Sequence, residues 1–178
     1  VYKRQEIKDF NANHSDMKKG FSLMPVTFGI SFTKTPMNQA RALVHIYTDG
    51  SVGVSTGAVE MGQGVNTKML QIATQIFSIT PKRVKLESTN TTRVANTSPS
   101  AASSTADLNG KALGKACNAL MDRLKICAAD HFNVSSHDVA VKDGVVYTNE
   151  NQTDLTWDQL VMMAFLKRIC LTENGHYA

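Results

Sequence analysis

The amino-acid sequence predicts an α+β fold with α/β-type layers, in which hairpins and a mixed sheet are combined with about three helices. Two features lead to this prediction. Asp-Gly pairs stand between short β-prone runs at two places, and apolar residues recur at helical spacing in the longer segments that follow. The 178 residues, of which 42% are hydrophobic, suffice for one domain or part of one.

Three strands are predicted before the first helix. Residues 21–33 are apolar and β-prone, and Gly29 indicates a bulge or a close backbone approach within that strand. Residues 42–47 and 51–55 flank an Asp-Gly pair. Because both turn residues tolerate positive φ, we expect these two runs to form a hairpin.

A helix and a further strand follow this hairpin. Between Thr67 and Phe77 the apolar residues fall at helical spacing, and Pro81 ends the element shortly afterwards. Residues 84–87 are then predicted to form a short strand. The succession of strand, helix and strand is typical of an α/β layer.

The second half of the chain begins with a long polar loop, residues 88–104. An apolar stripe then predicts a helix from Ala106 to about Ala129. Residues 139–141 and 145–147 flank the second Asp-Gly pair, which predicts another hairpin.

A last helix is predicted to begin after Thr156 and to run through Arg168. Thr156 can cap its first turn, and Leu155 and Leu160 can form an apolar staple across that cap. This is the third helix of the predicted fold.

Composition disfavours several classes of protein. The net charge of +4 comes from dispersed Lys and Arg residues and lacks the dense basic stripe of a nucleic-acid-binding face. The apolar runs are far shorter than the ~20 residues that a membrane-spanning helix needs. The first ten residues lack the apolar core and cleavage site of a signal peptide. We therefore expect a cytoplasmic protein that binds neither nucleic acid nor membrane.

Metal ligation and nucleophilic catalysis are also disfavoured. Cys117, Cys127 and Cys170 are too widely spaced for a zinc or iron–sulfur site, and we expect them to be core thiols in a reducing compartment. The five histidines are scattered. No Ser, Cys or Thr has a general-base partner at motif spacing.

Residues 60–64, Glu-Met-Gly-Gln-Gly, connect the first hairpin to the first helix. Gly62 and Gly64 free the backbone just before the unpaired N–H groups of the helix, an arrangement that suits an anion. The alternative is an ordinary strand-to-helix turn in which Gln63 hydrogen-bonds its own loop. On spacing alone this alternative is favoured.

Residues 96–105 form a second loop that is dense in small hydroxyl residues and leads into the second helix. Small side chains leave room for a ligand, while hydroxyls and backbone amides supply donors. The alternative is a Ser-rich cap and connector. Two such loops before two helices favour a ligand that is polyanionic or carries many acceptors, without identifying it.

Three stretches closely resemble the xanthine dehydrogenase and aldehyde oxidase family of molybdenum hydroxylases. They are residues 28–33 (Phe-Gly-Ile-Ser-Phe-Thr) followed by Asn38 and Gln39, residues 60–64 followed by Thr67 and Lys68, and residues 96–104 followed by residues 107–110. Their order and separations also fit the family, and the resemblance covers nearly the whole chain. Residues 98–103 are more similar to the xanthine dehydrogenase branch, which implies purine substrates.

The resemblance implies roles for individual residues. The family's Gly-Gln-Gly turn and Ala-Ala-Ser loop hold the molybdenum-molybdopterin cofactor, and they correspond here to Gly62, Gln63, Gly64, Ala101, Ala102, Ser103, Ser104 and Thr105. The family's Phe-Thr pair lines the substrate pocket and corresponds to Phe32 and Thr33, with Ala101 and Ala102 also expected to contact substrate. We expect the Phe32 ring to stack on a purine face and Thr33 to hydrogen-bond its edge. Without the resemblance, Phe32 would be predicted to be an ordinary core aromatic.

The chain lacks several segments that the family needs. The sequence contains no counterpart of the family's glutamate base in its Gly-x-Gly-Glu segment, of the upstream Gly-Gly-Gln cofactor loop, or of the purine-orienting Glu and Arg. No catalytic residue and no metal ligand are therefore assigned. We expect residues 1–178 to be a partial molybdopterin-binding domain, an internal fragment without its upstream and downstream parts, and to be inactive alone.

The resemblance implies oxidation of hypoxanthine to xanthine and of xanthine to urate, with oxygen taken from water. Electrons would leave through 2Fe-2S clusters and FAD on other domains or subunits of an oligomeric enzyme. An aldehyde oxidase or another N-heterocycle hydroxylase of the same family is the second hypothesis. A non-catalytic subunit fragment and a simple nucleotide-binding module are the alternatives from other classes.

Overall fold

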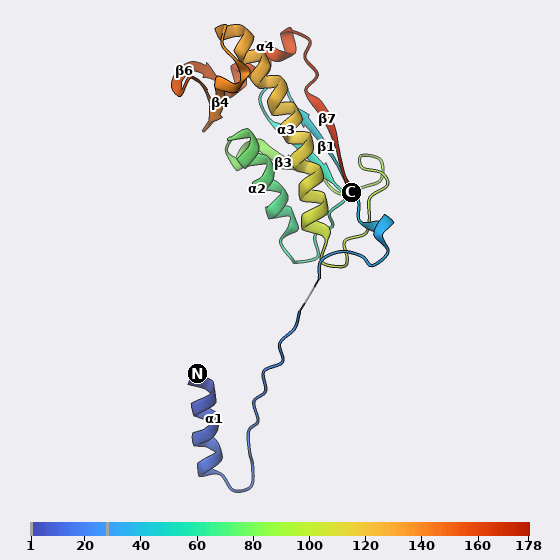
Figure 1. Ribbon diagram of the computed structural model, residues 1–178, viewed down its shortest axis with the longest axis vertical. Helices are drawn as coiled ribbons and strands as arrows, with labels where there is room; N and C mark the ends of the chain where they lie inside the picture. Colours follow the sequence, from blue (N-terminus) through green and yellow to red (C-terminus); the bar gives the residue numbers. More distant parts are fainter. Residues whose placement is uncertain (1, 28) are drawn as a thin grey trace.

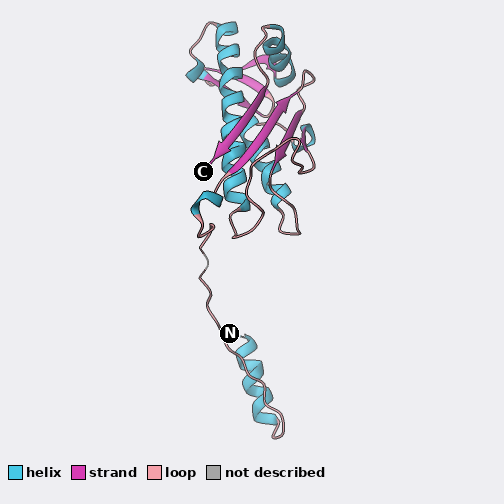
Figure 2. Cartoon of the chain, turned by 90° about the vertical axis from the view of Figure 1, so that its right-hand side faces the viewer, coloured by secondary structure: helices cyan, strands magenta, loops and turns pink. Residues whose placement is uncertain are grey.

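The computed structural model describes residues 2–27 and 29–178 and places two long helices against one face of a mixed sheet (Figure 1, Figure 2). The sheet has the order β3-β2-β1-β7. Its strands are β1 (Ala40–Ile46), β2 (Val52–Thr56), β3 (Val84–Leu86) and β7 (Thr172–Tyr177). β1 runs antiparallel to β2 and β7, whereas β2 and β3 are parallel. The predicted α+β fold with a mixed sheet is confirmed.

The first hairpin is confirmed in position and register. Ile46 pairs with Val52 across the turn, and Gly50 adopts a φ of 78°, which its missing Cβ allows. Alternate residues of β1 are buried against the helices, and these are Ala40, Ala42, Val44 and Ile46.

The predicted strand, helix and strand form a parallel crossover. Helix α2 (Val65–Phe77) leads from β2 to β3 through a short 3₁₀ turn at Pro81–Arg83. Val65, Met69, Ala73 and Phe77 are buried at four-residue spacing, so one stripe of α2 faces the core.

The longest helix, α3 (Thr105–Phe132), forms the centre of the core. It packs on α2, β1 and β7. Its stripe of fully buried side chains includes Leu113, Leu120 and Leu124, as the spacing predicts. The contact with β7 is close, because a Cβ added at Gly175 would lie 1.9 Å from the carbonyl oxygen of Ala112.

The second hairpin is also confirmed and gains a third strand. β4 (Val139–Lys142), β5 (Val145–Thr148) and β6 (Asn151–Thr156) form an antiparallel sheet in that order. β5 and β6 are joined by a tight turn in which Asn149 and Glu150 both have positive φ.

Helix α4 (Trp157–Leu166) follows β6 directly and has the predicted cap. The Thr156 hydroxyl accepts from the Gln159 N–H, and the Gln159 side chain accepts from the Thr156 N–H, which makes a reciprocal capping box. The helix ends at Leu166, two residues before the predicted end, and Arg168 has left the helix with a φ of 59°.

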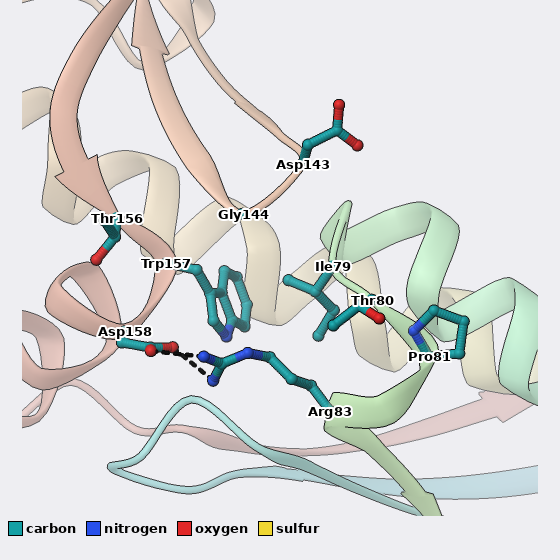
Figure 3. A pocket seen from close by; sticks show the side chains of 9 residues that line it. All are labelled: Ile79, Thr80, Pro81, Arg83, Asp143, Gly144, Thr156, Trp157 and Asp158. Atoms are coloured by element: carbon teal, nitrogen blue, oxygen red, sulfur yellow. Dashed lines mark hydrogen bonds and ion pairs between the residues drawn. The ribbon is translucent and has the colours of Figure 1, made fainter.

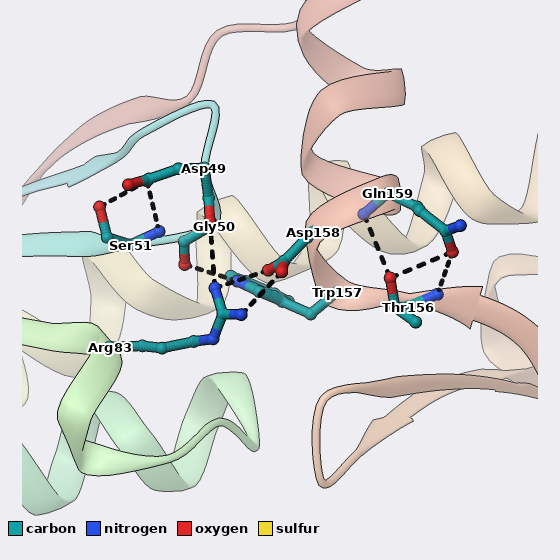
Figure 4. A network of polar contacts seen from close by, with 8 residues as sticks. All are labelled: Asp49, Gly50, Ser51, Arg83, Thr156, Trp157, Asp158 and Gln159. Carbon is teal, nitrogen blue, oxygen red and sulfur yellow. Dashed lines mark hydrogen bonds and ion pairs between the residues drawn. The ribbon is translucent and has the colours of Figure 1, made fainter.

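A polar network joins α4 to the first hairpin (Figure 4). The Arg83 guanidinium pairs with both oxygens of Asp158, at 2.6 and 2.7 Å, and donates to the Asp49 carbonyl at 3.0 Å. The buried Trp157 ring donates from Nε1 to the Gly50 carbonyl at 2.7 Å. These contacts fix the end of the β1–β2 hairpin against the start of α4.

The strand predicted at residues 21–33 is wrong for the part that the structure describes. Residues 21–27 and 29–33 are irregular, and Phe28 lies outside the described residues. The apolar side chains Leu23 and Met24 are 84% and 81% exposed, and no neighbouring strand pairs with residues 21–27 or 29–33. Gly29 shows no close backbone approach, since nothing described lies within 4 Å of an added Cβ.

A helix that the sequence did not predict precedes this segment. Helix α1 (Tyr2–Asn13) lies away from the rest of the fold (Figure 1). Its contacts are local: the Phe10 ring stacks on His14 at a centroid distance of 3.9 Å, and the Lys19 ammonium lies 4.0 Å from the Phe10 ring centroid.

The expectation that all three cysteines are core thiols is confirmed for two of them. Cys117 and Cys127 are buried in α3, but Cys170 is exposed between α4 and β7. The prediction for Cys170 is wrong because the connection in which it lies has left the apolar stripe of α4.

Candidate functional site

The two loops singled out by their glycines and hydroxyls meet at a cleft of about 310 Å³. The cleft lies where α2 and α3 begin. It is lined by Met61, Gln63, Val65, Lys68, Ser100, Ala101, Ser103, Thr105 and Ala106. Residues about 40 positions apart in the sequence therefore share one site.

The first loop is held by the side chain of Glu60. Its Oε1 accepts from the N–H groups of Gly62 and Gly64, and its Oε2 accepts from the N–H of Asn66, all at 2.9 Å. These backbone N–H groups stabilise the carboxylate and hold the pKa of Glu60 below its usual range. The Asn66 N–H has the largest effect on this pKa, and the Gly64 N–H has the next largest. The anion at the start of α2 is thus supplied by the chain itself.

Gln63 bonds to its own loop, as the alternative interpretation of this turn proposed. Its Oε1 accepts from the Met61 N–H at 2.6 Å, and its Nε2 donates to the Val59 carbonyl at 2.8 Å. The side chain is nevertheless exposed and lines the cleft. The hydrogen bonds of Gln63 within its own loop confirm the alternative interpretation, whereas binding of a ligand at this turn stays a prediction.

The second loop turns sharply before α3. Ala102 and Ser103 both have a φ of 53°, a left-handed conformation that is uncommon outside glycine. Ser104 is 2% exposed, and its hydroxyl donates to the Ala101 carbonyl at 3.0 Å. Ser104 therefore faces the interior, whereas Ser103 and Thr105 line the cleft.

Hydrogen bonds connect the two loops to each other and to a third segment. The Val59 N–H donates to the Ser100 hydroxyl at 2.8 Å, and the Ser31 N–H donates to the Ala102 carbonyl at 3.1 Å. The Ser98 N–H also donates to the Gln39 carbonyl at 3.3 Å. All three stretches that carry the family resemblance are adjacent in space.

Phe32 and Thr33 lie beside this site but do not line the cleft. Asn38 holds the backbone of Phe32 from both sides, accepting from its N–H at 2.8 Å and donating to its carbonyl at 2.9 Å. Phe32 is half-buried and Thr33 is exposed.

Sequence reasoning assigned no role to Lys68 at the cleft. It lies one helical turn after Gly64, and its N–H donates to the Gly64 carbonyl at 3.3 Å. The sequence does indicate this position of Lys68, because a residue four positions into a helix lies on the same side as the loop that precedes the helix.

Within residues 2–27 and 29–178, no hydrogen bond or ion pair engages the hydroxyls of Ser103 and Thr105 or the ammonium of Lys68. The Ser104 side chain also provides no cap for the first turn of α3. The cleft therefore offers several donors that are not satisfied by the described chain.

A second cleft, of about 560 Å³, lies on another part of the molecule (Figure 3). It is bordered by the start of α4, the β4–β5 turn and the segment before β3. Arg83 and Asp158, which lie at its wall, are paired with each other. Their charges are thus satisfied by the fold, and this cleft is a weaker candidate for a binding site.

The described residues contain no group of three or more His, Cys, Asp or Glu that could hold a metal ion. Among them, no helix combines the length and the apolar character needed to cross a bilayer.

Comparison with known proteins identifies the family of the chain. Residues 2–178 match the family described as the molybdopterin cofactor-binding domain. The chain belongs to this family. It is 46% identical over 175 residues to a xanthine dehydrogenase of Emericella nidulans and 45% identical over 175 residues to a xanthine dehydrogenase/oxidase of Rattus norvegicus. Each alignment covers 98% of this chain but only 11% and 12%, respectively, of the relative.

Solved structures show the same fold at lower identity. The chain matches quinoline 2-oxidoreductase from Pseudomonas putida 86 with a TM-score of 0.70 and 22% identity, over 78% of this chain and 19% of the other. It matches CO dehydrogenase from Oligotropha carboxidovorans with a TM-score of 0.69 and 20% identity, over 78% and 18%. The family match and the curated relatives thus confirm the expected molybdopterin-binding domain of the xanthine dehydrogenase and aldehyde oxidase family. The chain spans only 11–12% of the length of these relatives.

Proposed function

We propose that the chain supplies part of the molybdenum-molybdopterin site of a xanthine dehydrogenase. The observation that carries this proposal is the single cleft shared by the Gly-Gln-Gly turn and the Ala-Ala-Ser loop. In this view, residues 1–178 are a partial domain that works within a longer enzyme, because the chain covers only 12% and 11% of two of its relatives.

The donors around the cleft fit a ligand with many acceptors. Among the residues that the structure describes, no side chain or backbone group engages the side-chain donors of Ser103, Thr105 and Lys68, and the first turn of α3 lacks a side-chain cap. A pterin with a phosphate presents oxygen and nitrogen acceptors that such donors can satisfy. Since the start of α2 is already occupied by Glu60, the ammonium of Lys68 and the start of α3 are the parts of the cleft suited to negative charge.

The roles of the loop residues follow from their places. Gly62, Gln63 and Gly64 would border one side of the cofactor, with Ala101, Ala102, Ser103, Ser104 and Thr105 on the other. Ser104 would act indirectly, because its hydroxyl fixes the Ala101 carbonyl and not a ligand. When bound, the molybdenum centre would supply the two-electron redox chemistry of hydroxylation. No residue of this chain is proposed as the catalytic base.

We further propose that the substrate is a purine, hypoxanthine or xanthine, converted to urate. Phe32 and Thr33 would contact it beside Ala101 and Ala102, and the Asn38 clamp would keep the Phe32 backbone fixed. Identities of 37–46% to xanthine dehydrogenases support this branch. An aldehyde or another N-heterocycle is the second candidate, because the fold also matches quinoline 2-oxidoreductase.

The remaining parts of the proposal concern the whole enzyme. FAD and 2Fe-2S clusters on other domains or subunits would accept the electrons, and the enzyme would be an oligomer in the cytoplasm. The purine as partner, and the absence of nucleic-acid or membrane partners, stay predictions from the sequence.

The test is a comparison of Gln63→Ala with Gln75→Ala in the complete enzyme. Gln75 is an exposed residue of α2 outside the cleft, so it controls for the same chemical change. We expect Gln63→Ala to lower cofactor affinity by roughly tenfold, the effect of losing one useful hydrogen-bonding group. Molybdenum content measured by mass spectrometry and urate formation from xanthine are the readouts.

Equal molybdenum content in the two variants would contradict the proposed cofactor site. Normal molybdenum content with oxidation of aldehydes but not of xanthine would instead move the chain to the second candidate. Absence of molybdenum from the wild-type enzyme would leave the non-catalytic fragment as the better description.

A further inference from the structure

The carboxylate of Glu60 lies at the centre of the turn that carries Gln63. It accepts three backbone hydrogen bonds, from Gly62, Gly64 and Asn66. The first two donors belong to the turn and the third to the first turn of α2. One side chain therefore fixes the turn relative to the helix.

Apart from the contacts of Glu60 and the hydrogen bonds of Gln63 to Met61 and Val59, little in the described structure holds this turn in place. Gly62 and Gly64 have φ values of 99° and 77°, and no described atom lies within 4 Å of a Cβ added at either position. Met61 is 67% exposed. A turn with two glycines has many accessible conformations, so polar contacts, and not apolar packing, must restrict it to one conformation.

The ionised form of Glu60 is the one that makes these contacts. Its pKa is lowered from an ordinary value of 4.5, with the Asn66 N–H the largest cause. Because folding lowers this pKa, the contribution of the carboxylate is complete above the ordinary value and is lost as the pH falls through the lowered one. At neutral pH the Glu60 side chain is therefore ionised, and its carboxylate accepts all three backbone hydrogen bonds.

We propose that Glu60 is a positioning residue of the cofactor loop. Its carboxylate selects the one turn conformation that presents Gln63 to the cleft, and it keeps the start of α2 closed to any anionic group of the ligand. The expected consequence of this inference, retention of the cofactor, rests on the proposed function. Its structural part, the three hydrogen bonds, stands independently.

The structural part is tested with Glu60→Gln in this chain, by proton–nitrogen NMR at pH 7. Glu6→Gln is the matched control, since it removes the same charge in α1, a helix that lies away from α2 (Figure 1). Loss of a charged acceptor weakens the hydrogen bonds of its donors. We expect the amide protons of Gly62, Gly64 and Asn66 to move upfield together in Glu60→Gln and to stay in place in Glu6→Gln. Unchanged positions in Glu60→Gln would overturn the inference.

The functional part is tested in the complete enzyme with the same pair of variants. We expect molybdenum retention after prolonged dialysis to fall roughly tenfold in Glu60→Gln relative to Glu6→Gln, and the unfolding midpoint of the cofactor-free protein to fall slightly below the Glu6→Gln value because the charged acceptor is lost. Equal retention in the two variants would show that Glu60 does not position the loop for the cofactor.

The two tests separate the inference from the function on which it rests. If the wild-type enzyme retains no molybdenum, the proposed function fails whatever the NMR result. If it retains molybdenum and Glu60→Gln does so equally well, only the positioning role fails.

Discussion

Two of the three cysteines show how burial changes thiol chemistry. Desolvation raises the pKa of Cys117 to about 12, and it raises the pKa of Cys127 as well. Cys170 is exposed, and its Sγ lies 3.4 Å from the Thr172 carbonyl. A thiol must ionise to act as a nucleophile, so burial and a raised pKa disfavour reaction at Cys117 and Cys127, whereas Cys170 is exposed to a reagent.

We therefore expect iodoacetamide at pH 8 to modify Cys170 in the folded chain and to modify Cys117 and Cys127 only after unfolding. Peptide mass spectrometry after a short exposure measures this directly. Because folding raises the pKa of Cys117, this thiol leaves stability unchanged below its ordinary value of 9.0 and reduces it as the pH rises toward about 12. If Cys117 in the folded chain were modified as fast as Cys170, this result would contradict the burial of Cys117 in α3.

The contact between α3 and β7 depends on a glycine. Gly175 pairs with Ala42 across the sheet, and a Cβ there would lie 1.9 Å from the Ala112 carbonyl oxygen. The obstacle is helix backbone, which cannot move aside as a flexible side chain can. We expect Gly175→Ala to lower the free energy of unfolding by roughly 1–3 kcal/mol, the usual cost of overpacking.

Gly114→Ala in α3 is the matched control. Its added Cβ would meet only Ile76 Cδ1, at 3.9 Å, which is ordinary van der Waals contact. Alanine also favours the helix by about 1 kcal/mol relative to glycine, so this variant should be neutral or more stable. Urea denaturation of both variants gives the comparison. A Gly175→Ala variant as stable as Gly114→Ala would show that β7 does not pack this closely on α3.

Elements with local signals could be predicted from the sequence, whereas elements that depend on distant partners could not. Helices α2 and α3 have apolar stripes, both hairpins have Asp-Gly turns, and α4 has its capping box. β6 and β7 are mostly polar edge strands without a clear alternation, and they form because β5 and β1 offer free edges. Residues 21–27 and 29–33 show the reverse case, in which strand propensity without a partner strand gave no strand.

The same division applies to the candidate site. Glycines and small hydroxyls marked both loops, because their backbone freedom and size are local properties. The bonds that bring the loops together, from Val59 to Ser100 and from Ser31 to Ala102, join distant positions and have no local signal. The hydrogen bonds before α2 and α3 likewise had no local signal, since the Glu60 carboxylate accepts from Asn66 six residues later and the Ser104 hydroxyl donates back to the Ala101 carbonyl.

At the scale of the whole molecule, the chain divides into a packed body and an exposed arm. Residues 40–178 contain every member of the buried core, whereas residues 3–27 contain no buried side chain. The arm carries large apolar groups in solvent, among them Phe21 and Val26, which are 60% and 66% exposed. Little free energy therefore opposes local opening of the arm.

This difference predicts where a protease cuts first. We expect trypsin to cleave the folded chain after Lys18 and Lys19, which are exposed and lie beyond the end of α1, and to leave a resistant product that begins near Gly20. Arg83 and Lys115 provide internal controls, because their peptide bonds belong to the packed body next to β3 and within α3. Mass spectrometry over a time course gives the order of the cuts. Early cleavage after Lys115 would mean that α3 opens as readily as the arm and that the body lacks the core described for it.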